Sequence, residues 1–498
     1  MAVKRLMHFF KNSLSDFSII WLVFLPYISS VLILLLKKVR YSQETISFIA
    51  SCMLFYAAFN IYTQTTDNIS ALHVVLCEFT PKIQLTLKTE YIGIIFSILA
   101  SFLWIVTTIY TISYMRHNDK NNKKQSIFYA CFAASIGCTM GIAFSGNLLT
   151  LFIFYELLTI STYPLVTYYA NHESQISGRY YMGILLGTSM LLFLPAIIIT
   201  YNISGTLDFT KGGILPSSIS SVFLMSLLFL FIYSIGKTAL MPIHSWLPRA
   251  MVAPTPVSAL LHAVAVVKSG VFALIKVLLY IIGLERLQAL VQTHNNILMY
   301  ASAITILLAS FIAIKQTNLK KLLAYSTISQ LSYITIAVSL YTERAVDISI
   351  FQMISHAFAK ITLFFTAGAI YTKTGKKYLN ELQGIGKSMP ITMTAFSIGA
   401  AAMIGIPPAV TFWGKFFIIS ESLNQNIMSV VLVLIASTIL NTIYFIPIIY
   451  NAFYVPCNTN KYAEAPIPML IAISITTICT ILLFLYPDVI FNIINHLK

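Results

Sequence analysis

Long apolar segments follow one another along the whole chain and are separated by short polar loops. A helix needs about 20 mainly apolar residues to cross the hydrocarbon core of a bilayer, and about fourteen segments come close to or exceed that length. The pattern therefore predicts an all-α polytopic membrane protein, with no soluble domain between any two spans. The predicted spans are residues 19–36, 46–63, 91–114, 127–145, 147–170, 180–203, 219–243, 256–282, 296–314, 322–340, 348–372, 390–420, 427–452 and 466–492.

The composition supports the same class of protein. Of the 498 residues, 58% are hydrophobic and only 9% are charged, whereas about a quarter of the residues in a soluble domain are charged. These values exclude a soluble globular enzyme, a disordered chain and a fibrous protein. The lipid bilayer is therefore the predicted environment of the chain.

The charge of the chain is strongly positive, with 31 Lys+Arg against 16 Asp+Glu and a net charge of +15. In a membrane protein the positive-inside rule accounts for such an excess, so we expect no nucleic-acid partner. One set of alternate loops carries 17 Lys and Arg residues, and the opposite face, which includes both termini, carries 9. The richer loops are predicted to be cytoplasmic, which places both termini on the outer side. The first apolar segment is long for a signal sequence and is predicted to be a retained span.

No motif in the sequence indicates a bound cofactor. The six cysteines form no CxxC pair and show no spacing typical of iron–sulfur, zinc or haem sites. Walker A, GxGxxG, HExxH and GxSxG motifs are also absent from the sequence. We therefore expect no cofactor, no metal site, no redox centre and no catalytic residue within this chain, which argues against an ATP-driven pump or a membrane protease.

Five lysines and one glutamate lie well inside predicted spans. A lysine at the centre of a membrane helix costs about 2.5–3.5 kcal/mol on insertion scales, and such residues usually mark ion or proton paths. Glu156 is the only carboxylate predicted to lie deep in an apolar helix. Lys276 is closer to the end of its span and is expected to snorkel to the interface. The other four are Lys237, Lys268, Lys360 and Lys415.

These groups are typical of a proton pathway. Burial makes it easier for a lysine to release its proton near neutral pH, and a nearby carboxylate opposes that effect. Movement of a carboxylate such as Glu156, or of its proton, could therefore switch a lysine between holding and releasing H⁺. The alternative is a buried ion pair that serves only packing, but a single pair requires one lysine rather than four.

Two predicted spans are interrupted by proline close to a lysine. Pro242 follows Lys237 in the seventh span, and Pro407 and Pro408 precede Lys415 in the twelfth. Interrupted helices at matching places in two halves are typical of inverted-repeat transporters whose site lies near the membrane midplane. The predicted units are an N-terminal three-span part (1–126), a first inverted repeat (127–282), a second inverted repeat (283–452) and a last span (453–498).

Histidines add possible relay groups to this pathway. His356 lies four residues before Lys360, so the two share a helix face, and a histidine can relay protons near neutral pH. His262 is either such a relay or a hydrogen-bonded interior histidine. His244 and Trp246 lie near the end of a predicted span and are expected to anchor the membrane interface.

Several long motifs resemble one family of membrane subunits. They lie between about Phe128 and Tyr450 and read FYELLTISTYPLV, GKTALMPIHSWLPRAMVAPTPVSALLHAVAVVKSG, KQTNLKKLLAYSTISQLSYI, ISHAFAKITLFFTAGAI and GIPPAVTFWGKF. This set is similar to the antiporter-like subunits shared by the proton-pumping NADH:quinone oxidoreductase (complex I), Mrp-type Na⁺/H⁺ antiporters and membrane-bound hydrogenases. The resemblance implies fourteen transmembrane helices, two inverted five-helix repeats and broken helices 7 and 12.

The resemblance also implies roles for individual residues. Glu156 matches the essential glutamate of the fifth helix, and Lys237 matches its partner lysine in the seventh. Lys268 matches a lysine that is frequent in the eighth helix. His356 matches a histidine of the eleventh helix, and Lys415 matches the terminal lysine of the twelfth.

At one position the chain departs from this pattern. Some relatives have a second histidine four residues before His356, where this chain has Gln352. Since an amide does not exchange protons as an imidazole does, the relay is expected to be shorter here or to use water.

The resemblance leaves two functions open, because both use the same residues. The leading one is proton translocation in a multisubunit Mrp-type antiporter that exchanges H⁺ for a monovalent cation such as Na⁺ or K⁺. The other is proton pumping in a respiratory NADH:quinone oxidoreductase or a related hydrogenase, driven by redox chemistry in partner subunits. Both imply other membrane subunits as partners and a place in the bacterial inner (plasma) membrane or, alternatively, in the mitochondrial inner membrane. A structural scaffold and a channel are weaker alternatives.

Overall fold

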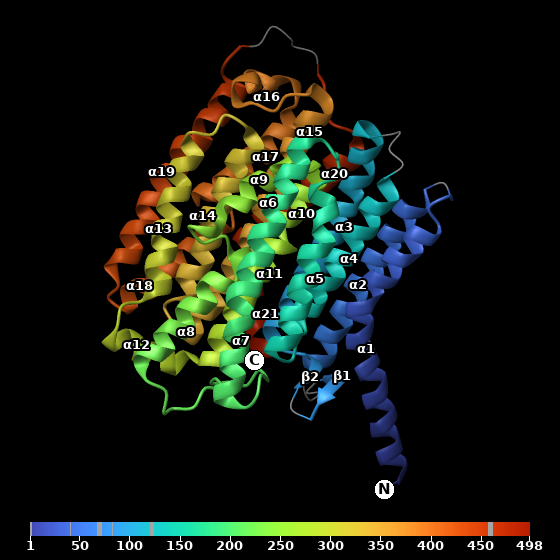
Figure 1. Cartoon of the computed structure of the whole chain (residues 1–498). Coiled ribbons are helices and arrows are strands. Elements are labelled where there is room, and N and C mark those ends of the chain that lie inside the picture. Colours follow the sequence, from blue (N-terminus) through green and yellow to red (C-terminus); the bar gives the residue numbers. More distant parts are fainter. Residues whose placement is uncertain (1, 40, 67–71, 82, 120–123, 457–461) are drawn as a thin grey trace.

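The computed structural model describes residues 2–39, 41–66, 72–81, 83–119, 124–456 and 462–498, with the side chains of residues 2–17 and of residue 262 outside that description. The chain forms a bundle of helices with a single small sheet in its described part (Figure 1). Both termini lie at the same end of the bundle, and α16 (Ile385–Ser388) lies at the opposite end.

Eleven helices in the described part of the chain are long and apolar enough to cross a membrane. This finding confirms the all-α polytopic class, whereas the number of fourteen spans and the inverted repeats stay predictions. The spanning helices are α1 (Ala2–Leu35), α2 (Ser42–Thr66), α3 (Tyr91–Asn118), α4 (Gln125–Ala143), α5 (Leu148–Val166), α6–η1–α7 (His172–Thr188, Ser189–Phe193, Leu194–Ser204), α10–α11–η5 (Thr255–Ala263, Val266–Lys276, Val277–Ile282), α13 (Ile297–Ile314), α15 (Glu343–Thr374), α19 (Met428–Phe453) and α20 (Ile467–Leu485).

The remaining helices are shorter or more polar. Two of them, α8 and α17, are apolar helices that end at the breaks described below. The full set is α8 (Ser221–Ser234), η2 (Gly236–Thr238), η3 (Ile243–Ser245), α9 (Trp246–Arg249), η4 (Ala250–Val252), α12 (Leu284–Thr293), α14 (Leu319–Val338), η6 (Leu379–Leu382), α16, α17 (Pro390–Ile404), α18 (Thr411–Asn424) and α21 (Asp488–Leu497).

Proline explains two departures from a regular spanning helix. The predicted span 466–492 is wrong as a single helix, because α20 ends at Leu485 and α21 begins after Pro487. Proline disfavours the helical conformation of the residue before it, and Tyr486 accordingly has φ −127° and ψ 64°. Within the sixth span, Pro195 lacks the N–H that a helix requires, and the turn before it widens into the π-helical segment η1.

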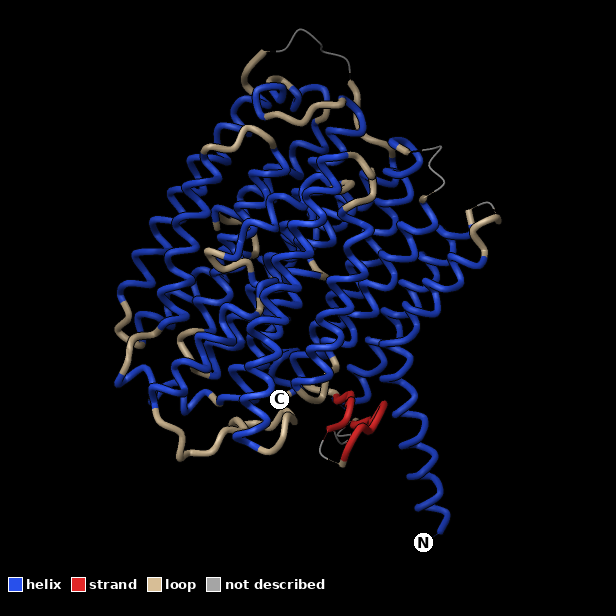
Figure 2. Tube along the Cα trace, in the orientation of Figure 1, coloured by secondary structure: helices blue, strands red, loops and turns tan. Residues whose placement is uncertain are grey.

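A β-hairpin at the end of the bundle that carries the termini has no counterpart among the predicted elements (Figure 2). It consists of the antiparallel strands β1 (His73–Thr80) and β2 (Ile83–Lys88). The tight turn predicted between the fourth and fifth spans is present, and Asn147 within it caps α5 by accepting a hydrogen bond from the N–H of Thr150 at 2.8 Å. The amide of Asn147 also donates to the carbonyl of Gln84 at 2.7 Å, which fixes the hairpin to this turn.

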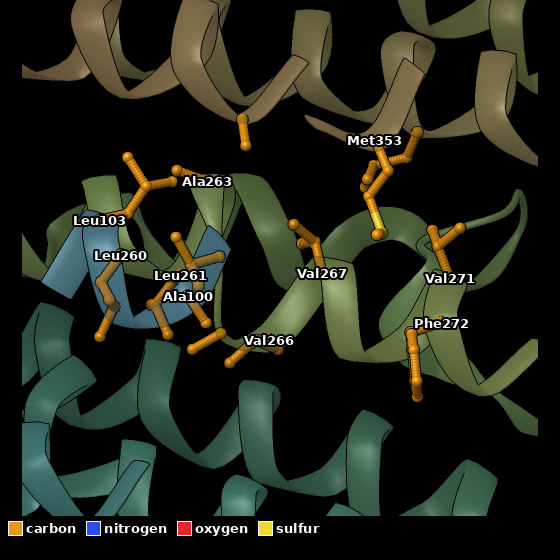
Figure 3. Close-up of a cluster of buried hydrophobic side chains, with 14 of the residues drawn as sticks. Ala100, Leu103, Leu260, Leu261, Ala263, Val266, Val267, Val271, Phe272 and Met353 are labelled. Atoms are coloured by element: carbon orange, nitrogen blue, oxygen red, sulfur yellow. The ribbon is translucent and has the colours of Figure 1, made fainter. Parts of the chain in front are cut away.

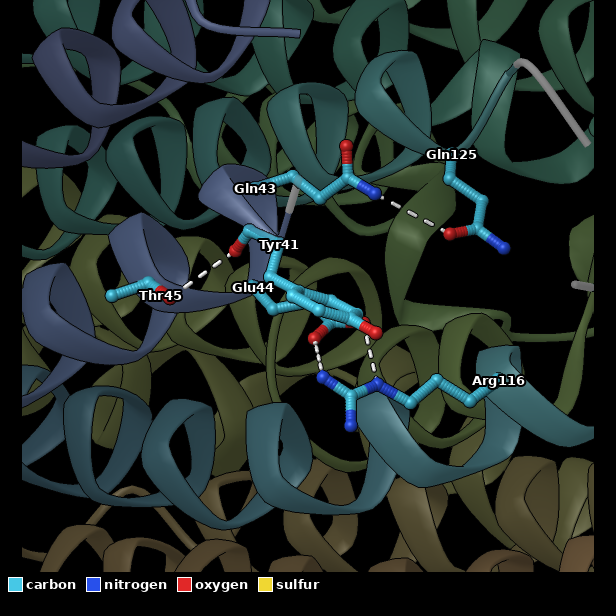
Figure 4. A network of polar contacts seen from close by, with 6 residues as sticks. All are labelled: Tyr41, Gln43, Glu44, Thr45, Arg116 and Gln125. Atoms are coloured by element: carbon cyan, nitrogen blue, oxygen red, sulfur yellow. Dashed lines mark hydrogen bonds and ion pairs between the residues drawn. The ribbon is translucent and has the colours of Figure 1, made fainter. Parts of the chain in front are cut away.

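The interior of the bundle combines apolar packing with local polar ties. Val267 of α11, Leu261 of α10, Ala100 of α3 and Met353 of α15 belong to one buried hydrophobic cluster (Figure 3). At the end of the bundle opposite the termini, the Arg116 guanidinium binds the buried carboxylate of Glu44 through two hydrogen bonds and joins α3 to α2 (Figure 4). Apolar packing and this ion pair therefore both tie neighbouring helices to one another.

Candidate functional site

The seventh predicted span is interrupted at Lys237. Helix α8 ends at Ser234, and Lys237 lies in the short turn η2 that follows. The indole N–H of Trp246 donates a 3.0 Å hydrogen bond to the carbonyl of Gly236, which stabilises the break. Trp246 is fully buried, so the prediction that it anchors the membrane interface is wrong. Its amphipathic ring serves a freed backbone carbonyl inside the protein instead.

Lys237 is fully buried and makes three contacts with one tyrosine. Its Nζ donates a 2.5 Å hydrogen bond to the backbone carbonyl of Tyr155 and lies 3.1 Å from the centre of the Tyr155 ring. The backbone N–H of Lys237 donates to the Tyr155 hydroxyl at 3.1 Å. A cation held over an aromatic face is stabilised without a neighbouring anion. This arrangement offsets part of the cost of burying the ammonium group in the protein interior.

Glu156 follows Tyr155 on α5, and Glu156 is 7% exposed. It attracts Lys237 electrostatically, but the two do not form an ion pair with N···O within 4.0 Å. Neither carboxylate oxygen accepts a well-aligned hydrogen bond among the described residues, although the Ser189 hydroxyl lies beside the group. The predicted pair is therefore close enough to interact and is not locked in contact.

Helix α11 lies against the break and carries the next lysine. Gly270 allows this approach, because a Cβ at that position would lie 2.5 Å from the backbone carbonyl carbon of Lys237. Lys268, on the same helix, is fully buried, and its Nζ lies 2.6 Å from Nδ1 of His356 on α15. The structure therefore brings the predicted residues Lys268 and His356 into direct hydrogen-bonding contact across two helices.

Lys360 follows His356 by one turn of α15 and is also fully buried. Its Nζ donates to the Ser326 hydroxyl at 2.5 Å and to the carbonyl of Leu323 at 3.2 Å, both on α14. Lys360 therefore faces α14, whereas His356 contacts α11. The side chain of His262 lies outside the described residues, so its choice between relay and interior histidine stays a prediction.

The second break separates α17 from α18 and lies beside Lys415. The end of α17 frees the carbonyls of Met403 and Ile404, which accept hydrogen bonds from Lys415 Nζ at 3.3 and 2.6 Å. Gly405 has φ +86°, and a Cβ there would lie 2.6 Å from Cδ of Lys415. Glycine is required at this turn both by its left-handed conformation and by the lysine that crosses it.

Lys415 borders a cavity. The cavity measures about 300 Å³ and lies between α18 and α19, with the side chain of Thr438 in its wall. Lys415 Nζ contacts the Thr438 hydroxyl at 3.3 Å. The lysine therefore reaches a space that could hold water or a neighbouring helix.

An amide pair fills the region between His356 and Lys415. Gln352 on α15 donates through Nε2 to Oε1 of Gln330 on α14 at 3.2 Å. Gln330 in turn donates to the Met403 carbonyl at 3.2 Å, the same oxygen that Lys415 contacts. Oε1 of Gln352 is buried without a hydrogen-bond partner in the described structure. The amide pair leaves one acceptor oxygen available on the route between the two ionisable groups.

The prediction that Lys276 snorkels to the interface is wrong. Lys276 is fully buried, and its Nζ lies 3.0 Å from the Glu90 carboxylate and 2.5 Å from the Ser145 carbonyl. Glu90 precedes α3 at the foot of the β-hairpin, so sequence reasoning placed it in a loop. Glu421, near the end of α18, is likewise only 6% exposed. The sequence contained a signal for the pair of Lys276 and Glu90, because a lysine at this depth requires a partner.

The site residues form a succession of neighbouring elements rather than one cluster. The succession leads from α5 and the first break through α11, α15 and α14 to the second break. Protons could pass along it if water bridges the gaps, because its lysines, histidine and glutamate can each hold or release H⁺. Within the described residues, no group of three or more His, Cys, Asp or Glu is arranged to hold a metal ion.

Comparisons with known proteins identify the family of the chain. The family model described as "NADH:quinone oxidoreductase/Mrp antiporter, TM" matches residues 145–440, more than half of the chain. The chain is 29% identical over 419 residues to the NADH-quinone oxidoreductase subunit N of Desulforudis audaxviator, covering 80% of this chain and 82% of that protein.

Subunits of cation antiporters also match. The chain is 32% identical over 346 residues to one from a probable K⁺/H⁺ antiporter of Rhizobium meliloti, covering 69% of this chain. It is 27% identical over 503 residues to one from the Na⁺/H⁺ antiporter of Alkalihalophilus pseudofirmus, covering 94% of this chain. The chain spans 34% and 61% of the lengths of these two relatives.

Two solved structures have the same fold. A chain of an archaeal membrane-bound sulfane sulfur reductase, a respiratory membrane complex, superposes with a TM-score of 0.85 at 23% identity, covering 96% of each chain. A chain of the Mrp complex from Dietzia sp. superposes with a TM-score of 0.81 at 17% identity, covering 97% of this chain and 96% of that chain. At these identities the likeness establishes the fold alone.

Proposed function

Because this chain belongs to the NADH:quinone oxidoreductase/Mrp antiporter transmembrane family, we propose that it translocates protons as a membrane subunit of a multisubunit monovalent cation/proton antiporter. The observation that carries the proposal is the geometry of Lys237 and Glu156. Lys237 is fully buried at a helix break and is held by Tyr155, while Glu156 interacts with it without being locked in contact. A small movement of Glu156 would change the electrostatic field at the ammonium group and so favour uptake or release of H⁺.

The remaining site residues supply the onward path in this proposal. Lys268 and His356 pass a proton across α11 and α15, and Lys360 provides a further group facing α14. Lys415 is the last group, at the cavity between α18 and α19. His262 lies on α10, before Lys268, and is the remaining candidate relay. Chain residues 127–282 and 283–452 are the proposed inverted repeats, flanked by residues 1–126 and 453–498.

The proposed setting is the bacterial plasma membrane, with both termini on the outer side and the lysine-rich loops in the cytoplasm. The proposed partners are other membrane subunits, and the exchanged ion is Na⁺ or K⁺. A second candidate function is proton pumping in a respiratory NADH:quinone oxidoreductase. It is favoured by the subunit N relative, of which the chain spans 82%, more than of either antiporter relative.

The test uses the assembled complex in everted membrane vesicles. Glu156→Gln keeps the size of the side chain and removes its charge, so dissipation of a pH gradient on addition of Na⁺ or K⁺ should fall to the background. The matched control is Glu285→Gln, because Glu285 is exposed on α12. Normal exchange by Glu156→Gln at normal protein level contradicts the proposal.

A separate measurement distinguishes the two candidate functions. The complex is purified with its partners, and its flavin and iron content is determined. Neither group together with cation-dependent H⁺ exchange supports the antiporter. Stoichiometric flavin and iron–sulfur clusters together with NADH-driven proton pumping support the oxidoreductase.

A further inference from the structure

A cavity lined by lysines opens at the end of the bundle opposite the termini. Its volume is about 440 Å³, and its walls come from the start of α6, the segment before α10, the loop before α14 and the end of α15 with the residues that follow. Its charged lining residues are Lys315, Lys320, Lys321, Lys376, Lys377 and Glu173. None of the proton-pathway residues proposed above lines this cavity.

The charge of this lining is unbalanced. Five lysines face one glutamate, and none of the five lies within 4.0 Å of a carboxylate in the described structure, where all ion pairs lie elsewhere. The nearby carboxylate of Glu381 accepts hydrogen bonds from the backbone N–H groups of Lys377 and Tyr378 at 2.9 and 3.0 Å, and its charge offsets part of that of Lys376 and Lys377. Like charges brought together in a partly enclosed space repel one another unless an anion neutralises them.

Two lysine-bearing loops are fixed to each other by their backbones. The N–H of Leu319 donates to the carbonyl of Lys377 at 3.0 Å, and the N–H of Leu379 donates to the carbonyl of Thr317 at 2.9 Å. These bonds hold the segment around residues 315–321 beside the segment around residues 376–378. The lysines therefore converge through fixed structure rather than through chance positions of two separate loops.

Side-chain contacts orient two of these lysines further. Nζ of Lys320 donates a 2.6 Å hydrogen bond to the carbonyl of Ala253, so this half-buried side chain is held in the cavity wall. Nζ of Lys377 lies 4.9 Å from the centre of the Tyr371 ring. Lys320 and Lys377 each keep donor N–H groups available after these contacts, since an ammonium group has three of them.

The positive-inside rule explains why this end of the bundle carries many lysines, but not why five of them surround one cavity. Lys373 at the end of α15 and Lys387 in α16 carry charge on the same face and do not line the cavity, although Lys315, Lys321 and Lys377 of the lining are exposed as they are. Lys373 and Lys387 show that lysines on this face can be dispersed in solvent. The convergence of the other five therefore requires a separate explanation.

We propose that this cavity binds the phosphate group of an anionic ligand. A phosphate offers several acceptor oxygens and at least one negative charge to several ammonium donors at once. The group could belong to the headgroup of an anionic phospholipid or to free phosphate, and the chemistry of recognition is the same for both. This site is independent of the proposed proton pathway.

The test measures binding to the purified full complex in detergent, with two ³²P-labelled probes. One probe is phosphatidylglycerol in mixed micelles with phosphatidylcholine, and the other is inorganic phosphate. The cavity variant is Lys315→Gln with Lys376→Gln, which leaves the backbone bonds and the Ala253 contact intact. The control variant, Lys373→Gln with Lys387→Gln, removes the same charge from the same face.

We expect the cavity variant to bind at least one probe about tenfold more weakly than the wild type, and the control to bind almost normally, because only the lysines that line the cavity can contact one phosphate group together. Tighter binding of phosphatidylglycerol than of inorganic phosphate identifies a lipid site, and the reverse order identifies a site for free phosphate. Equal loss in both variants, or no saturable binding of either probe, overturns the proposal. Gel filtration and a thermal unfolding curve of each variant show that a loss of binding does not come from misfolding.

Discussion

Two buried lysine–glutamate pairs in this chain are held in opposite ways. Lys276 and Glu90 form an ion pair at 3.0 Å, and Lys276 also donates to the Ser145 carbonyl. Lys237 and Glu156 interact without an ion pair inside 4.0 Å, and the lysine is held by a tyrosine instead. Both lysines are fully buried, so depth alone does not separate them.

The difference indicates which pair can change its state. A tight pair with an additional carbonyl contact leaves little freedom for either partner, and separating its charges in the interior is costly. A loose pair leaves the carboxylate room to move closer to the lysine or farther away from it. We infer that the Glu90–Lys276 pair fastens α11 to the foot of the β-hairpin, and that the Glu156–Lys237 pair is the one that switches.

The largest effect is expected for Lys237→Ala. Removal of this ammonium group leaves Glu156 without its cation, and the proton path loses the group at its first break. Ion exchange should fall by about a thousandfold, within the range that a positioned proton-transfer group contributes. The measurement is dissipation of a pH gradient in everted vesicles, or proton pumping if redox partners are present.

Protein level decides how this result is understood. The alanine variant should insert and assemble normally, because it removes a buried charge that costs about 2.5–3.5 kcal/mol on insertion scales. Lys237→Arg should restore little transport, since arginine does not release its proton. Loss of the protein together with transport would indicate a packing pair, and near-normal transport would remove Lys237 from the path.

Lys276→Met is expected to lose stability and keep transport, whereas Lys237→Ala is expected to lose transport and keep its protein level. Lys276→Met leaves the Glu90 carboxylate buried without its partner, which should lower the free energy of unfolding by about 3 kcal/mol. Unfolding in detergent measures the loss, and transport per folded molecule should stay close to normal. The double variant with Glu90→Leu should regain most of the stability. A variant that folds normally but transports nothing would contradict the fastening role.

The contrast also explains what could be predicted from the sequence. Apolar segment length was sufficient for the membrane class, and proline beside a lysine located both helix breaks. Glu90 was missed because it lies between two elements of different kind, and the β-hairpin that brings it to Lys276 contains no long apolar run. Pairing between distant segments is set by the packed structure, which no local pattern records.

Some of the site residues could also be predicted from the sequence, and others could not. Lys237, Lys268, His356 and Lys415 could be singled out because charge inside an apolar run is rare. The role of Tyr155 was not predictable, because an aromatic residue in a membrane helix usually serves packing. Its backbone carbonyl and its ring both contact Lys237, and only the three-dimensional course of α5 beside η2 produces that contact.

An intermediate effect is expected for Lys415→Ala. This lysine borders a cavity, whereas Lys237 is enclosed, so water could partly replace its ammonium group. Exchange should fall by about tenfold, since a bridging water carries hydrogen bonds almost as well as a direct contact. Lys415→Arg distinguishes two roles, because it keeps the charge but not the exchangeable proton. Full rescue by arginine would show that Lys415 acts through its charge rather than by transferring a proton.

The smallest effect is expected for Gln352→His, which alters the link between the two halves of the path. Gln352 lies one helical turn before His356, and its Oε1 is buried without a hydrogen-bond partner among the described groups. Gly414 faces that oxygen, so the space for an imidazole ring depends on the absence of a side chain there. An imidazole can take up and release a proton where an amide cannot, so exchange should stay normal or rise by about twofold.

The control is Gln352→Leu, whose side chain can neither transfer a proton nor form a hydrogen bond. It should lower exchange by about twofold at unchanged protein level. If the leucine variant exchanges ions as well as the histidine variant, protons do not pass between His356 and Lys415 at this position, and Lys415 must be reached from the cavity alone.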